Sequence, residues 1–177
     1  MNPKVVLLRG INLGPRNRIA MPALREALTA EGFGDVRTYV QSGNVVLSSD
    51  DSPEALAKRV GEMIAETFEL DIPVVVRTRD ELAEVVKRDP LGEVAVNPKR
   101  YQVTFLGREL DEATLEKLDG LKLPGEQFVA LGRELYAWHP EGVARSKLWP
   151  ALAKQKEATA RNWTTVTQLL AMADGAA

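Results

Sequence analysis

An arginine-rich segment near the start of the chain carries the side chains best suited to binding an anion. Residues 9–18 read RGINLGPRNR and contain three arginines and no acidic residue. Arginine grips phosphate or carboxylate through paired N–H donors, and a helix N-terminus adds free amides and a favourable dipole. We therefore expect Arg9, Asn12, Arg16 and Arg18 to hold an anion where this segment enters the next helix.

The glycine spacing in this segment excludes two familiar phosphate-binding loops. A Walker A loop requires G-x-x-x-x-G-K-[ST], and a dinucleotide fingerprint requires G-x-G-x-x-G within a parallel βαβ unit. The segment has only G-x-x-x-G, through Gly10 and Gly14, and no lysine. A structural alternative stays open, in which the glycines supply unusual backbone angles and Arg9 caps carbonyls or pairs with an acid.

Two further motifs contain candidate ligand-binding side chains. In QSGN, Ser42 and Asn44 are either ordinary turn residues or ligands, and the sequence does not show whether they lie near the arginine-rich segment. Near the C-terminus, Arg145, Lys147 and Arg161 precede expected helices, where cations oppose the helix dipole unless an anion is present. The full set of expected ligand-binding residues is Arg9, Gly10, Asn12, Ser42, Asn44, Arg145, Lys147, Arg161 and Asn162.

The residue types that would support catalysis or metal binding are scarce. The chain has no cysteine and a single histidine, His139, so thiolate chemistry and multi-histidine metal centres are excluded. Ser146 and Lys147 are adjacent on an expected helix and so do not face each other as a catalytic pair. No reaction is assigned from the sequence, and no cofactor or metal is expected.

The first half of the chain shows a repeating order of elements. Short apolar or β-branched runs alternate with amphipathic segments of period 3.6, which indicates β, α, β, β, α, β. The expected elements are a strand at 4–9, a helix from Pro22 to about Gly32, strands at 36–41 and 44–48, a helix from Pro53, and a strand at 73–78. This order predicts a ferredoxin-like arrangement, with two helices on one face of a four-stranded antiparallel sheet.

The second half repeats this order in part. After a helix at 80–88, we expect strands at 101–106, 127–131 and 135–139, helices at 111–118 and after Ser146, and a last helix capped by Asn162. The predicted fold class is therefore α+β, with two related βαββαβ-type subdomains of which the second is partial. The expected domains are residues 1–88, a linker at 89–98, and residues 99–177 with the C-terminal helix.

Composition and charge limit the kinds of partner. The net charge is -2, with basic ends and an acidic middle: residues 50–134 carry twelve basic and nineteen acidic residues. No stretch has the roughly 18 apolar residues of a membrane span, so a cytoplasmic protein without membrane contact is expected. The leading interpretation is binding of a small anionic or phosphorylated ligand; the alternative is a protein-interaction or homodimer-forming module. RNA binding is less favoured, because the expected strand NVVLS lacks the stacking aromatics of RNA-recognition domains.

Three motifs together resemble a known bacterial family. LLRGINLG with MPALREAL, then VRTYVQSGNVVLSS, and finally RSKL with TARNWTTVTQL occur in order along the chain. The sequence resembles the family catalogued as domain of unknown function 1697, and the resemblance covers nearly the whole chain. It implies two related α+β subdomains and no established activity. The paired glycine usual after GIN in that family is Gly14-Pro15 here.

Overall fold

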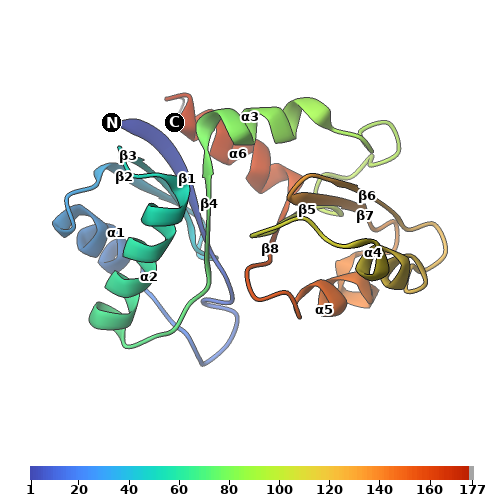
Figure 1. Cartoon of the computed structure of the whole chain (residues 1–177), viewed down its shortest axis with the longest axis horizontal. Helices are drawn as coiled ribbons and strands as arrows, with labels where there is room; N and C mark the ends of the chain where they lie inside the picture. The colour runs from blue at the N-terminus through green and yellow to red at the C-terminus, as the bar shows by residue number, and fades with distance from the viewer. Residues whose placement is uncertain (176–177) are drawn as a thin grey trace. The chain divides into compact units, whose positions relative to one another are not determined.

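The computed structural model describes residues 1–175, which divide into two compact units (Figure 1). One unit contains Met1–Glu84 and the end of the chain from Thr167, and the other contains Val85–Val166. No helix within residues 1–175 has the length and apolar character needed to cross a membrane.

The first unit has the predicted βαββαβ order. Its elements are β1 (Asn2–Leu8), α1 (Met21–Ala30), β2 (Gly34–Tyr39), β3 (Asn44–Ser49), α2 (Pro53–Phe68) and β4 (Val74–Thr78), followed by α3 (Arg79–Arg88). The strands form one antiparallel sheet in the order β2-β3-β1-β4. Alternate residues of β1, such as Val6 and Leu8, face α1 and α2 and are fully buried with Leu24 and Leu56.

The second unit repeats the same topology completely. Its elements are β5 (Tyr101–Phe105), α4 (Glu112–Asp119), β6 (Gln127–Leu131), β7 (Glu134–Trp138), the 3-10 turn η1 (Val143–Arg145), α5 (Leu148–Leu152), β8 (Thr159–Asn162) and α6 (Trp163–Ala173). The sheet order β6-β7-β5-β8 matches that of the first unit strand for strand. One face packs against α4 and α5 through a cluster that includes Leu118, Leu135 and Leu152 (Figure 1).

The second repeat is complete, and not partial as predicted, because residues 159–162 form a strand. Thr159 and Arg161 lie opposite Phe105 and Val103 of β5, so the segment pairs along the edge of the sheet. Four residues are too few for period-2 alternation to be recognised in a sequence, and the adjoining helix signal of Asn162 obscured the strand.

The two sheets place an arginine at the same position. In the first unit Arg77 of β4 lies opposite Val5 of β1, and in the second Arg161 of β8 lies opposite Val103 of β5. Both arginines are buried, at 2% and 8% exposure, and each is followed two residues later by the first residue of a helix. The equivalence therefore extends from topology to individual residues.

The unit boundaries fall inside α3 and α6, which corrects the predicted division at residues 88 and 99. Val85 belongs to the second unit, where its carbonyl accepts a 2.8 Å hydrogen bond from the Tyr136 hydroxyl. Met172 belongs to the first unit, where its carbonyl accepts a 2.7 Å hydrogen bond from the Arg37 guanidinium. Residues 89–98 are also part of the second unit and not a free linker, since Leu91 is 7% exposed and its amide donates to the Tyr101 hydroxyl.

Candidate functional site

The loop between β1 and α1 is anchored at an edge that it shares with two other segments. The Leu8 amide at the end of β1 donates to the Gly43 carbonyl at 2.9 Å, and the Arg9 amide donates to the Pro73 carbonyl at 3.1 Å. Because β1 runs antiparallel to both β3 and β4, its end lies beside the starts of those strands. The structure thus brings the RGIN and QSGN motifs together.

Asn12 fastens the loop by three side-chain hydrogen bonds. Its Nδ2 donates to the Ile19 carbonyl at 2.8 Å and to the Gln41 carbonyl at 2.7 Å, while its Oδ1 accepts from the Ile19 amide at 2.9 Å. Its own amide donates to the Asn17 carbonyl at 3.0 Å, which closes the loop on itself. The Asn12 side chain is therefore engaged in fixing the loop, and the ligand-binding role predicted for it stays a prediction.

The QSGN residues build the turn that supports this loop. Asn44 is fully buried, and its Nδ2 donates to the Tyr39 carbonyl and to the Ser42 Oγ. Gly43 has a φ of +84°, and a Cβ there would lie 2.7 Å from the Cβ of Leu8. The structure gives Ser42 and Asn44 a turn-forming function, which was the alternative left open by the sequence.

Two arginines of the loop face solvent. Arg16 and Arg18 are exposed, and Leu13 at the same loop is 82% exposed. Gly10, with a φ of +71° and open space around its α-carbon, lies at the start of this loop. The loop, drawn in blue in Figure 1, extends beyond the ends of the strands. No aspartate or glutamate occurs before Glu26, so the positive charge of this segment is not compensated locally in the sequence.

Helix α1 begins directly after these arginines and has no side-chain cap. Its N-cap is Ala20, which offers no acceptor, and its first turn has no acidic residue. The other long helices are capped: Ser52, Asp111 and Asn162 accept from the amides of Ala55, Thr114 and Thr165, and Thr78 and Glu81 cap α3 reciprocally. Pro22 has no N–H and the Leu24 amide donates to the Ala20 carbonyl, so the start of α1 presents the amides of Met21 and Ala23, with two arginines shortly before them in the sequence. Ala20, where Ser, Thr, Asp or Asn is usual, was the sequence signal for this feature.

A groove runs along the side of α1 from its first turn. Its volume is about 610 Å³, and it is open to solvent. Arg25 on its wall donates to Thr38 Oγ1 at 2.6 Å, which links α1 to β2. The lining residues are Pro22, Arg25, Glu26, Thr29, Ala30 and Val36.

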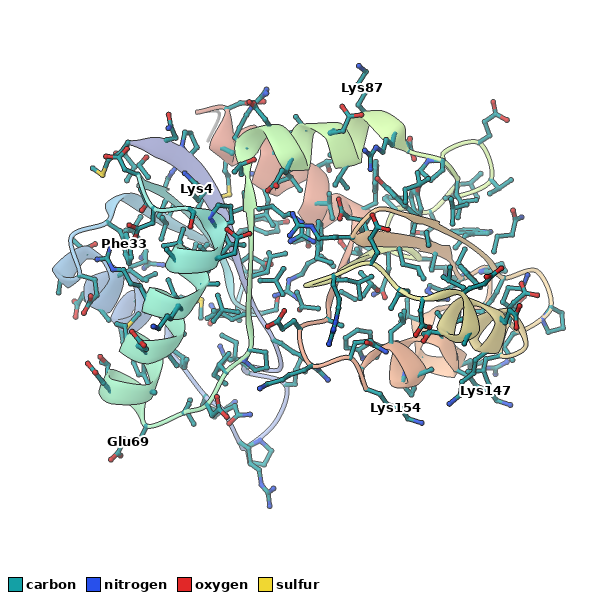
Figure 2. The ribbon with its side chains drawn as sticks, in the orientation of Figure 1. Lys4, Phe33, Glu69, Lys87, Lys147 and Lys154 are labelled. Atoms are coloured by element: carbon teal, nitrogen blue, oxygen red, sulfur yellow. The ribbon has the colours of Figure 1, made fainter. Side chains whose placement is uncertain are left out.

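The C-terminal candidate residues do not form one cluster of exposed cations. Arg145 and Lys147 are exposed around η1 and the start of α5, where Figure 2 shows Lys147 extending away from the ribbon. Arg161 is buried in β8, where its Nη1 donates to Thr159 Oγ1 at 2.6 Å and to the Ala160 carbonyl at 2.9 Å, and burial lowers its pKa to about 10. Asn162 caps α6, as its residue type predicted. Arg145 and Lys147 precede α5, which has only five residues, and Arg161 lies in β8 two residues before α6.

His139 belongs to a buried polar trio that the sequence analysis missed. Its Nδ1 lies 2.5 Å from Glu126 Oε2, and both side chains are at most 3% exposed. Burial alone raises the pKa of Glu126, but hydrogen bonds from the Leu123 amide, His139 and Ser146 outweigh it and hold this pKa below its usual value. The carboxylate accepts from both the histidine and the serine, so it separates the two groups that a serine nucleophile and its base would need in direct contact. Glu126 gives no local sequence signal, because it follows Gly125 in what reads as an ordinary turn.

Metal binding has no geometric support in the described part of the chain. Within residues 1–175, no three His, Asp or Glu side chains lie close enough together to hold a metal ion. The acidic residues described above instead cap helices or accept hydrogen bonds from neighbouring groups.

Comparisons with known proteins show similarity in structure over nearly the whole chain and in sequence over most of it. The structure is similar to that of the conserved bacterial protein SP0830 from Streptococcus pneumoniae, with a TM-score of 0.77 and 23% sequence identity over 97% of this chain and 98% of that one. At this identity the likeness shows a shared fold. No curated protein matches the chain. The model of the family described as "Protein of unknown function (DUF1697)" matches residues 1–136, and the chain belongs to that family.

Proposed function

We propose that the protein binds a small anionic or phosphorylated ligand at the start of α1, through Arg16, Arg18 and the amides of Met21 and Ala23. The observation that carries the proposal is the pairing of an uncapped helix N-terminus with two exposed arginines, with no acidic residue in the sequence before Glu26. Phosphate oxygens accept strongly from both kinds of donor.

The rigidity of the loop supports this proposal. Binding is weakened when a site must be ordered at the moment of association, at a cost of about 0.5–1.5 kcal/mol for each immobilised side chain. The three hydrogen bonds of Asn12 and the Asn17 carbonyl fix the loop backbone in advance. Only the two arginine side chains then lose freedom when a ligand binds.

The groove beside α1 supports a ligand larger than inorganic phosphate. It begins at Pro22, within the first turn of α1, and its volume lies in the range of small-molecule sites. An anionic group at the helix start leaves room along the groove for the uncharged part of the same molecule.

The proposal is tested by calorimetric titration of the protein with phosphate, nucleotides, sugar phosphates and a short RNA. Arg16→Ala and Arg18→Ala should each weaken binding of a phosphorylated small molecule about tenfold, equivalent to about 1.4 kcal/mol for one charge-assisted contact. Lys58→Ala is the matched control, since Lys58 is an exposed cation of the same unit that pairs with Glu62. Equal affinities for all three variants, or no binding by the native chain, would refute the proposal, and binding of RNA alone would replace it.

A further inference from the structure

Strand β6 forms an edge of the second sheet that differs from the three other sheet edges. Native proteins protect edge strands from pairing with other chains by placing charges, prolines or bulges in them. The residues of β6, QFVAL, include no charge, proline or glycine, and their register with β7 is continuous from Gln127 to Leu131.

The other edges all carry protective features. Strand β2 is bulged between Gly34 and Arg37, with Asp35 at a φ of +47°. Strand β4 contains Arg77 and follows Pro73, and β8 has only four residues including Arg161. The contrast singles out β6 as the edge that lacks these protective features.

The turn next to β6 fixes which backbone groups point outward. Leu131 and Glu134 flank the two-residue turn formed by Gly132 and Arg133, in which Gly132 has a φ of +59°. Residues that flank such a turn bond to each other, and every second residue along the strand does the same. Val129 and Gln127 therefore bond to β7, whereas the N–H and C=O groups of Phe128 and Ala130 point away from the sheet.

We infer that β6 is a homodimer interface, in which the edge strands of two copies pair antiparallel about a two-fold axis at Val129. In this register Phe128 of each copy lies opposite Ala130 of the other, so that the four outward N–H groups meet the four outward C=O groups. The two sheets join into one sheet of eight strands.

The side chains suit a second copy of the same chain. A two-fold axis brings like residues face to face, so a charge on the axis would repel its own copy. Val129 on the axis is uncharged, and Phe128 lies beside the small Ala130. Lys122 has its Nζ 5.8 Å from the Phe128 ring and pairs with Asp119 at 2.7 Å, so the charge of this lysine is compensated. A strand of this length buries a small area, and the dimer is therefore weak and concentration-dependent.

The inference is tested by sedimentation equilibrium of the full chain over a concentration series that reaches the millimolar range. The native chain should shift from monomer to dimer mass as concentration rises, with the amides of Phe128 and Ala130 becoming protected from hydrogen exchange in step. Val129→Lys and Val129→Glu should each stay monomeric, because each places like charges across the axis.

Mixing the two variants in equal amounts provides the control for folding. A lysine then faces a glutamate, and the concentration-dependent rise in mass should return as a heterodimer, which damage to the fold would not allow. The inference is overturned if the native chain stays monomeric throughout the series, if either variant associates as the native chain does, or if the mixture fails to associate.

Discussion

Replacement of Glu126 by glutamine should lower the free energy of unfolding far more than the same change at a surface position. In the native chain an ionised Glu126 can only accept hydrogen bonds, so the proton on the 2.5 Å contact belongs to His139 Nδ1. Glutamine replaces one acceptor oxygen of the carboxylate by an N–H₂ group, so His139 or Ser146 must change from donor to acceptor to stay paired, and the ionised acceptor is lost. Disrupting a buried hydrogen-bonded group in this way costs about 1–3 kcal/mol.

This loss is large relative to the total stability of a domain, about 5–15 kcal/mol. For a chain of this length it corresponds to a fall of roughly 2–12 °C in the melting temperature. The assay is urea and thermal unfolding at pH 7 followed by circular dichroism. Glu141→Gln is the matched control, because Glu141 is exposed and lies two residues from His139, and its effect should stay within about 0.5 kcal/mol. A loss of less than about 1 kcal/mol for Glu126→Gln would refute the reasoning.

The pH dependence of the same pair provides a second check. The pKa of Glu126 is lower in the folded chain than in the unfolded chain, so its stabilising contribution is present above the unfolded pKa and is lost as the pH falls through the folded pKa. The difference in unfolding free energy between the native chain and Glu126→Gln should therefore shrink below about pH 4.5, the unperturbed value. A difference that stays constant down to pH 3 would show that the pKa of Glu126 is not lowered in the folded chain.

The remaining predictions concern single contacts. Gly43→Ala places a Cβ 2.7 Å from that of Leu8 at a φ of +84°, and it should lower the free energy of unfolding in urea by about 1–3 kcal/mol. Gly14→Ala is the control and should be neutral, because a Cβ at Gly14 has nothing within 4 Å. Equal effects of the two changes would contradict the steric account. Asn12→Ala removes three hydrogen bonds and should cost about 2–4 kcal/mol, with faster hydrogen exchange at the Ile19 amide; an unchanged Ile19 rate would show that the loop is held by other means. Tyr136→Phe leaves the Val85 carbonyl without its hydroxyl donor and should lower the free energy of unfolding by about 1–3 kcal/mol. Tyr39→Phe should change it by almost nothing, and a larger loss for Tyr39→Phe than for Tyr136→Phe would rule out this role for the Tyr136 hydroxyl.

Local patterns were enough to predict the elements and several of their ends. The amphipathic pattern predicted a helix from Pro53, and α2 begins at that residue with Leu56, Val60 and Ile64 on its buried side. The cap at Asn162 was also predicted from residue type alone. Such features depend on neighbours within a few residues, which a sequence displays directly.

The parts that could not be predicted depend on contacts between distant residues. The partner of His139 is Glu126, thirteen residues earlier. The Gln41 carbonyl that accepts a hydrogen bond from the Asn12 side chain is 29 residues away. The burial of Arg161 depends on the pairing of β8 with β5. From the sequence alone, Arg161 was interpreted as a cation placed just before a helix. Residue type suggested that these side chains bind something, and only the fold shows that they bind other parts of the same chain.

The position of the unit boundary inside α6 has a consequence for the order of folding during synthesis. Domains generally fold from the N-terminus as the chain leaves the ribosome. Here the Arg37 guanidinium donates a hydrogen bond to the carbonyl of Met172, which lies 135 residues later in the chain. All of Val85–Val166 emerges before that contact can form. The unit that is translated first is therefore the one that is finished last, and it remains without its final segment throughout the synthesis of the other.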